Sequence, residues 1–152
     1  MRIFLIGFMG SGKTYTGRRM AKMLGRDFID LDEYIEAKEG RTISAIFAQE
    51  GEDYFRKIEK KCLHEMKKKS NAIIATGGGT PCFFDNMDWM NRNGRTVYLE
   101  TPAETLLQRL KNEKEKRPLL KNFSTKELRL FIKNKLKERE AFYHKAEITI
   151  EN

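Results

Sequence analysis

The sequence has few of the features that mark secreted or membrane proteins. Its two cysteines, Cys62 and Cys82, are too isolated for a disulfide framework or a zinc site, so we expect buried or inert thiols in a reducing cytoplasm. No apolar run approaches the length of a membrane span. The first motif begins six residues after Met1, which leaves no room for a signal peptide. The 152 residues, without repeats or low-complexity linkers, are therefore expected to form one cytoplasmic domain with no membrane partner.

Aromatic residues are missing from the places where a nucleic-acid-binding surface would need them. The net charge is +8, and much of the excess lies in Lys60-Lys61, in Lys67-Lys68-Lys69 and in the 111–121 stretch. Acids are interspersed with these bases and no aromatic residues interleave them as stacking platforms, so we expect no nucleic-acid partner. The first two clusters are typical of a solvated helix face. The third lies where a loop would cover a triphosphate, so an anionic small molecule explains it.

One stretch near the start, Gly7 to Thr14, carries the pattern G-x-x-x-x-G-K-T with an extra glycine at Gly10. It follows the apolar run 3–6 and precedes a segment with helical spacing, which is the context that this motif requires. Glycines let successive N–H groups point at one phosphate, and the helix adds its N-terminal N–H groups. Lys13 supplies a charge for the β- and γ-phosphates, and the Thr14 hydroxyl suits Mg²⁺. We expect this loop to bind a nucleoside triphosphate rather than to be a plain glycine-rich turn.

The remaining pattern alternates strands with helices. We expect strands at 2–6, 28–32, 72–75, 96–99 and 148–150. Helices are predicted from the loop to Leu24, in pieces over 33–51, over 52–69, around 85–93, after Thr101 and from Ser124 to Tyr143. This alternation predicts an α/β fold with a parallel sheet, whose ligands collect at the carboxyl ends of the strands.

Several local predictions follow from spacing and turn chemistry. Met20, Met23 and Leu24 should face inward from the first helix, which Gly25 should end. Thr101 and Ser124 each begin a capping-box pattern. The 111–123 stretch is charged and lacks periodicity, so we expect a mobile loop there.

Two further strand ends carry unusual residues. Asp30 and Asp32 are two apart, so within an extended strand they would point the same way. In a phosphoryl-transfer site one acid can hold the metal and the other can orient and deprotonate an attacking hydroxyl. The structural alternative is that these acids cap the following helix. The turn 76–79, Thr-Gly-Gly-Gly, permits close backbone approach and offers N–H groups to a ligand, although a flexible turn would have the same sequence.

Three arginines are candidates for binding anionic groups. Arg56, Arg117 and Arg139 are each, taken singly, typical surface residues. Beside a phosphate loop, their expected roles are bidentate capture of a substrate carboxylate and neutralisation of charge on the transferring phosphoryl group.

Taken together, these motifs resemble shikimate kinase, a family in the nucleoside-monophosphate-kinase-like branch of P-loop proteins. The matching stretches are GFMGSGKT at 7–14, FIDLD at 28–32, G-x-x-I-x-x-I-F at 40–47, GEDYFRKIE at 51–59, ATGGG at 75–79, RPLL at 117–120 and ERxxxY at 138–143. They occur in order and cover nearly the whole chain. The resemblance implies a three-layer α/β/α fold of the P-loop NTPase class with a five-stranded parallel sheet.

The resemblance also implies a reaction and a set of roles. The γ-phosphoryl group of ATP would pass to the 3-hydroxyl of shikimate with Mg²⁺ as cofactor. Asp32 would act as base, and Lys13 and Arg117 would stabilise the transferred group. The nucleotide-binding residues would be Gly10, Ser11, Gly12, Lys13, Thr14, Tyr15, Arg109 and Arg117; the shikimate-binding residues Asp32, Arg56, Gly77, Gly78, Gly79 and Arg139; and the metal ligands Thr14 and Asp30.

Within a single kinase domain over 1–152, the resemblance implies a substrate-binding subdomain at about 33–60 and a lid at about 111–123. Members of the family continue past the final strand with a loop for the nucleotide base and a closing helix, whereas this sequence extends to Asn152. Either the chain is truncated or the adenine is held by fewer contacts. A monomer is expected, since no apolar stripe is left over once the core is assigned.

Two other functions fit parts of the sequence. A related small-molecule kinase, for gluconate or a nucleoside monophosphate, would share the phosphate loop, but paired Arg56 and Arg139 suit an acidic substrate and the triple glycine argues against both. A nucleotide-binding regulatory or nucleic-acid-associated module without turnover would fit the charge of +8. That module would bind nucleotide or polyanion without shikimate-dependent ADP release.

Overall fold

A five-stranded, all-parallel sheet forms the centre of the protein. The computed structural model describes the backbone of residues 1–152 and the side chains of all of them except residues 115 and 118. The strands are β1 (Ile3–Ile6), β2 (Asp27–Asp30), β3 (Ala72–Ala75), β4 (Arg95–Glu100) and β5 (Ile148–Glu151). They lie in the order β2-β3-β1-β4-β5, and every neighbouring pair is parallel. The predicted α/β fold with a five-stranded parallel sheet is confirmed.

Seven α-helices and four short 3₁₀ turns connect and cover the strands. The α-helices are α1 (Lys13–Leu24), α2 (Leu31–Glu39), α3 (Ile43–Glu50), α4 (Glu52–Glu65), α5 (Asn86–Asn93), α6 (Ala103–Asn112) and α7 (Thr125–Tyr143). The 3₁₀ turns are η1 (Met66–Lys68), η2 (Thr80–Cys82), η3 (Lys114–Lys116) and η4 (Pro118–Leu120). Each connection between successive strands contains at least one α-helix. The helix carries the chain back to the end of the sheet at which the next parallel strand begins.

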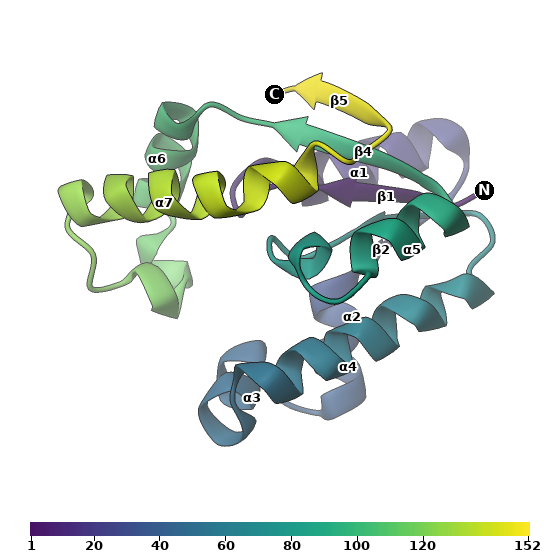
Figure 1. Ribbon diagram of the computed structural model, residues 1–152, viewed down its shortest axis with the longest axis horizontal. Helices are drawn as coiled ribbons and strands as arrows, with labels where there is room; N and C mark the ends of the chain where they lie inside the picture. The colour runs from purple at the N-terminus through teal and green to yellow at the C-terminus, as the bar shows by residue number, and fades with distance from the viewer.

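The helices lie on both faces of the sheet. Alternate strand residues such as Leu5, Ile73 and Val97 pack with Ala21 of α1 on one face. The residues between them, such as Phe4 and Ile74, join buried side chains of α2, α4 and α5 in the largest core cluster on the other face. Figure 1 shows this arrangement, with α1 behind the sheet and α5 in front of it. The three-layer α/β/α architecture is therefore as predicted.

Beyond the carboxyl ends of the strands, α6 and α7 pack against each other over the loop that follows β1. Leu106, Leu110, Leu128 and Ile132 are fully or almost fully buried there together with Phe8 of the loop. On the other side of the carboxyl ends of the strands, α2, α3 and the start of α4 form a second group, at the bottom of Figure 1. The site described below lies between these two groups. Among the described residues, no helix is long and apolar enough to cross a membrane.

Three local predictions were wrong. Met23 and Leu24 are exposed, because the buried face of α1 consists of Gly17 and Ala21, with Met20 partly buried beside them. Thr101 does not cap α6, which begins after Pro102 and has no side-chain cap. By contrast, Gly25 ends α1 in the left-handed conformation, and Ser124 with Glu127 forms the predicted capping box of α7.

The 111–123 stretch is not an unstructured loop. It contains the end of α6 and the turns η3 and η4, which pack against each other. Leu120 is buried in the cluster of α6 and α7. The two 3₁₀ turns have three residues each, which is too short to produce a helical periodicity in the sequence. The side chains at 115 and 118, which belong to the predicted lid, lie outside the described residues.

Candidate functional site

The loop between β1 and α1 wraps closely around its own backbone. Gly10 has φ +83° and Gly12 has φ +91°, conformations that side chains other than glycine rarely adopt. A Cβ on Gly10 would also lie 3.1 Å from a methyl group of Leu110, so the loop packs directly on α6. Ser11 is buried beneath the loop, where its N–H donates to the carbonyl of Phe8 at 3.1 Å. The loop thus has the curled backbone that the motif predicts.

Lys13 points back into this loop. Its Nζ donates to the carbonyl oxygens of Gly7 at 2.5 Å and of Phe8 at 3.1 Å. Burial lowers the pKa of Lys13 to about 8, with Asp32 opposing the shift and Arg117 adding to it. The Lys13 ammonium is therefore held by neutral carbonyl groups. A negatively charged triphosphate would attract it more strongly than these carbonyls do.

Asp30 ends β2 and caps α2. Its Oδ1 accepts N–H bonds from Asp32 at 2.9 Å and from Glu33 at 3.2 Å, so the structural alternative, a helix cap, holds for this residue. Its other oxygen, Oδ2, accepts a bond from the Thr14 hydroxyl at 3.4 Å. One carboxylate oxygen and one hydroxyl thus lie together beside the loop. Mg²⁺ in nucleotide sites is typically held by such hard oxygen ligands together with phosphates and water, so these residues fit that ion.

Asp32 is not part of a strand, which corrects the expectation that it points the same way as Asp30 within extended backbone. β2 ends at Asp30, and Asp32 lies in the first turn of α2. Burial, together with the nearby carboxylates of Asp30 and Glu59, raises the pKa of Asp32 to about 6. A carboxyl group with this pKa is ionised near neutral pH and is basic enough to accept a proton.

Most of the predicted residues line one pocket of about 650 Å³. Its wall consists of Met9, Gly10, Gly12, Lys13, Thr14, Tyr15, Thr16, Arg19, Asp30, Asp32, Ala75, Thr76, Gly77, Gly78, Arg109, Glu113, Arg117 and Asn152. The phosphate loop, the acid pair and the glycine turn therefore meet at the carboxyl ends of the strands. Ser11, Arg56, Gly79 and Arg139 are outside this wall.

Arg56 and Arg139 nevertheless reach the same glycine turn. A Cβ on Gly78 would lie 3.0 Å from Nη1 of Arg139, and a Cβ on Gly79 would lie 2.7 Å from Nη2 of Arg56. Two guanidinium groups from α4 and α7 thus converge on consecutive residues. A side chain at Gly79 would displace the guanidinium of Arg56, and one at Gly78 would crowd that of Arg139.

A buried network holds Arg56. Its Nη1 donates to Oε1 of Glu59 at 2.9 Å, and the other oxygen of Glu59 accepts a 2.7 Å bond from the Thr80 hydroxyl. Glu59 is 1% exposed and Thr80 is fully buried. Glu52, which is largely exposed, accepts a longer bond of 3.3 Å from Nη2. Arg56 is therefore fixed from beneath by a carboxylate that is itself hydrogen-bonded.

Arg139 lies in a different environment. Its guanidinium carbon is 5.5 Å from the ring centre of Phe8 in the phosphate loop. One turn further along α7, the hydroxyl of Tyr143 donates to the carbonyl of Gly78 at 2.6 Å. Burial raises the pKa of Tyr143 above its usual range, so this hydroxyl stays protonated as a donor. The end of α7 thus supports the glycine turn from the side opposite α4.

The remaining predicted nucleotide residues lie around the mouth of the pocket. Nη1 of Arg109 donates to the carbonyl of Gly10 at 3.0 Å. Nε of Arg117 pairs with Glu113 at 2.9 Å. Tyr15 is exposed on the first turn of α1, with the guanidinium of Arg19 5.6 Å from its ring centre. The side chain of Tyr15 is thus exposed, and those of Arg109 and Arg117 are partly exposed.

Sequence reasoning assigned no role to Glu59, Thr80 or Asn152. Glu59 stands three residues after Arg56 on one helix, a spacing that predicts contact and was available in the sequence. Thr80 gives no such signal, because its partner is 21 residues away. The same holds for Asn152, whose Nδ2 donates to the carbonyl of Ser11 at 2.7 Å across 141 residues.

Known proteins match this chain over almost its whole length. The sequence profile of the family described as shikimate kinase matches residues 9–152. A shikimate kinase of Parabacteroides distasonis is 51% identical over 150 residues, which cover 99% of this chain and 87% of the relative. One from Azobacteroides pseudotrichonymphae is 51% identical over 148 residues, with 97% of this chain and 87% of the relative covered.

Solved structures agree. The crystal structure of shikimate kinase from Bacteroides thetaiotaomicron superposes with a TM-score of 0.97 at 44% identity, covering 99% of this chain and 86% of that one. A shikimate kinase from Acinetobacter baumannii in complex with shikimate gives a TM-score of 0.90 at 40% identity, covering 99% and 83%. These neighbours confirm the predicted P-loop NTPase fold. The chain belongs to the shikimate kinase family.

Proposed function

We propose that this protein transfers the γ-phosphoryl group of ATP to the 3-hydroxyl of shikimate, giving shikimate 3-phosphate and ADP. The observation that carries the proposal is the position of Asp32, which lies in one pocket with Lys13 while two arginines reach the adjoining glycine turn. Relatives named shikimate kinase, including one solved with shikimate, support the substrate.

On the acceptor side, Arg56 and Arg139 bind the shikimate carboxylate. Two guanidinium groups that converge on Gly78 and Gly79 suit a planar carboxylate, which accepts paired N–H bonds from arginine. The backbone of Gly77, Gly78 and Gly79 forms the floor on which the ring lies. Asp32 hydrogen-bonds the hydroxyl that reacts. The segment 33–60 carries Arg56 and acts as the substrate-binding subdomain.

On the phosphate side, the loop N–H groups of residues 10–15 surround the β- and γ-phosphates, and Lys13 leaves its carbonyl partners to bind them. Thr14 and Asp30 would hold Mg²⁺, which neutralises phosphate charge and orients the triphosphate when it is bound. Arg109 and Tyr15, which line the same pocket, contact the nucleotide. Arg117, on the lid at about 111–123, approaches the phosphates when the lid closes and water is excluded.

The reaction then follows from these positions. The carboxylate of Asp32 accepts the proton of the 3-hydroxyl as that oxygen attacks the γ-phosphorus. The bond between the γ-phosphorus and the bridging oxygen breaks, and ADP leaves with the bond's electron pair. Lys13 and Arg117 stabilise the negative charge on the transferring group. Closure of the lid prevents water from taking the place of the hydroxyl.

Coupled measurement of ADP release with ATP and Mg²⁺ tests this function. The reaction is run without an acceptor and with shikimate, gluconate or AMP. We expect release that depends on shikimate alone. Release with gluconate or AMP and none with shikimate would identify a different small-molecule kinase. Tight ATP binding without release with any acceptor would favour the non-catalytic nucleotide-binding module.

A further inference from the structure

An aromatic ring covers Arg56. The guanidinium carbon of Arg56 lies 4.1 Å from the ring centre of Phe83, well within the range of a cation–π contact. The ring of the preceding residue, Phe55, is farther away, at 5.2 Å. Arg56 as a whole is only 9% exposed. The Phe83 ring therefore shields one face of the group that we propose to hold the shikimate carboxylate.

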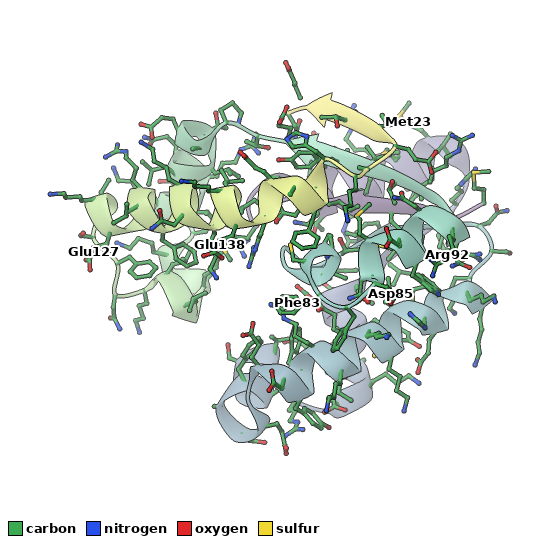
Figure 2. All side chains as sticks on the ribbon, viewed as in Figure 1. Met23, Phe83, Asp85, Arg92, Glu127 and Glu138 are labelled. Atoms are coloured by element: carbon green, nitrogen blue, oxygen red, sulfur yellow. The ribbon has the colours of Figure 1, made fainter. Side chains whose placement is uncertain are left out.

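The backbone around Phe83 is built to present this ring. The η2 turn is closed by the N–H of Cys82, which donates to the carbonyl of Gly79 at 3.0 Å. Asn86 is fully buried, and its Nδ2 donates to the carbonyl of Thr80 at 2.9 Å. Phe84 then reverses the chain with φ +51°, a conformation that is uncommon for a bulky residue. Figure 2 shows Phe83 between this turn and the α3–α4 pair.

The reversal separates the two neighbouring rings. Phe83 turns toward Arg56, whereas Phe84 is 56% exposed and its ring centre lies 5.0 Å from Nζ of Lys60. Both rings contact a cation of α4. Only the inner ring contacts a cation at the glycine turn, so the adjacent outer ring is a matched control.

The contacts of Arg56 divide by geometry. Glu59 and Glu52 accept hydrogen bonds from the Nη atoms at the edge of the guanidinium, whereas its central carbon lies over the ring of Phe83. Within the described residues, Nε of Arg56 has no hydrogen-bond partner. With one face of the guanidinium next to the ring, the edge that carries the Nη atoms is the side on which a carboxylate can accept two parallel N–H bonds. The ring also prevents the plane from tilting and keeps water off its face.

We propose that Phe83 is a positioning residue for substrate recognition, which fixes the guanidinium plane of Arg56 so that it binds the shikimate carboxylate edge-on. The inference rests on the proposed function and goes beyond it, because it assigns acceptor affinity to a residue outside the pocket wall. It acts through Arg56 and leaves the phosphate side untouched.

The test compares Phe83→Leu with Phe84→Leu and Phe83→Tyr in the full chain. We expect Phe83→Leu to raise the KM for shikimate about tenfold, the size of a desolvated cation–π contact, with kcat and the KM for ATP changed less than about twofold. Phe84→Leu should leave all three constants near wild type. Phe83→Tyr, which keeps the ring, should restore the KM for shikimate.

A substrate analogue separates positioning from simple packing. With shikimate methyl ester, which lacks the negative charge that Arg56 binds, Phe83→Leu should lose much less activity relative to wild type than it does with shikimate. Equal losses with both compounds would overturn the proposal, because the ring would then shape the pocket without acting through Arg56. An unchanged KM for shikimate in Phe83→Leu would also overturn it. A wild-type protein inactive with shikimate would contradict the proposed function instead.

Discussion

The phosphate side and the acceptor side of the site are built in different ways. The phosphate side comes from one continuous segment, in which Lys13 is held by the carbonyls of Gly7 and Phe8 of its own loop. The acceptor side is assembled from α2, α4, the glycine turn and α7, and its Arg56 is fixed by the buried side chain of Glu59. The first arrangement holds a charge with neutral dipoles, and the second holds it with an ion pair.

This difference separates a part that must rearrange from a part that is already formed. Lys13 has to exchange two carbonyl bonds for phosphate contacts when nucleotide arrives, and Arg117 has to leave Glu113. Arg56 keeps its partner Glu59 and needs only to receive a carboxylate. We therefore expect variants of the phosphate side to lower turnover and variants of the acceptor side to weaken shikimate binding.

The largest effect is expected from Lys13→Ala. No other residue nearby in the sequence can replace this charge on the phosphates, so kcat should fall by about 10,000-fold. Shikimate affinity, measured by calorimetry, should change little. A variant that kept turnover while losing shikimate affinity would reverse the assignment of the two sides. Circular dichroism checks that the variant is folded.

Asp32→Asn removes the proposed base, and kcat should fall by about 1,000-fold. ATP affinity should remain near wild type, because the phosphate contacts are intact. Near-normal turnover would show that Asp32 is not the base.

The same variant should also change stability with pH. Because burial raises the pKa of Asp32 in the folded state, its ionisation above about pH 6 destabilises the fold. At pH 8 the free energy of unfolding of Asp32→Asn should exceed that of wild type by about 1–2 kcal/mol. This difference should shrink as the pH falls through 6 toward 4. Urea unfolding at several pH values measures it, and a difference independent of pH would contradict the raised pKa.

Arg117→Ala tests the mobile cation of the phosphate side. Its pairing with Glu113 leaves it beside the pocket, so removal should lower kcat by about 100-fold with little effect on shikimate binding. Arg129→Ala, which removes an arginine paired with Glu104, is the matched control and should be nearly neutral. A large loss of shikimate affinity in Arg117→Ala would move this residue to the acceptor side.

The smallest expected effect is on the pH dependence of kcat/KM, which should differ between shikimate and ATP. The kcat/KM for shikimate should rise as the pH passes about 6, because the base Asp32 must lose its proton. The kcat/KM for ATP should fall as the pH passes about 8, because Lys13 must keep its proton to bind phosphate. Asp32→Asn should lose the acidic limb and keep the alkaline one. An acidic limb near pH 4, the range of an ordinary aspartate, would contradict the buried base.

The same contrast explains which parts of the structure could be predicted from sequence. The phosphate loop, the strands and most helix ends depend on neighbours in the chain, such as Gly25 after α1 and the Ser124 cap of α7. These were predicted correctly, except that the strand predicted at 28–32 ends at Asp30. The exposure of Met23 and Leu24 was not predicted, because helical spacing alone does not reveal how far the sheet extends beneath α1.

For the acceptor side, the residues proposed to bind the substrate were predicted, but most residues that hold them in place were not. Arg56 and Arg139 were candidates from the sequence, and the contact of Glu59 with Arg56 could have been predicted from their spacing on one helix. Thr80 and Phe83 could not, because they belong to a segment that meets α4 only in the folded chain. Asp32 illustrates the same limit. The spacing of the two acids suggested that they share one face of a strand. In the structure the side chain of Asp30 caps a helix that begins at Leu31, so Asp32 is helical.

The position of the new phosphate on the product tests whether the 3-hydroxyl of shikimate is the group that Asp32 activates. Shikimate incubated with ATP, Mg²⁺ and the protein is analysed by ³¹P and ¹H NMR. We expect one new phosphomonoester whose phosphorus couples to the proton at C3, because Asp32 activates that hydroxyl alone. A phosphorus coupled to the proton at C4 or C5, or inorganic phosphate in place of an ester, would contradict it.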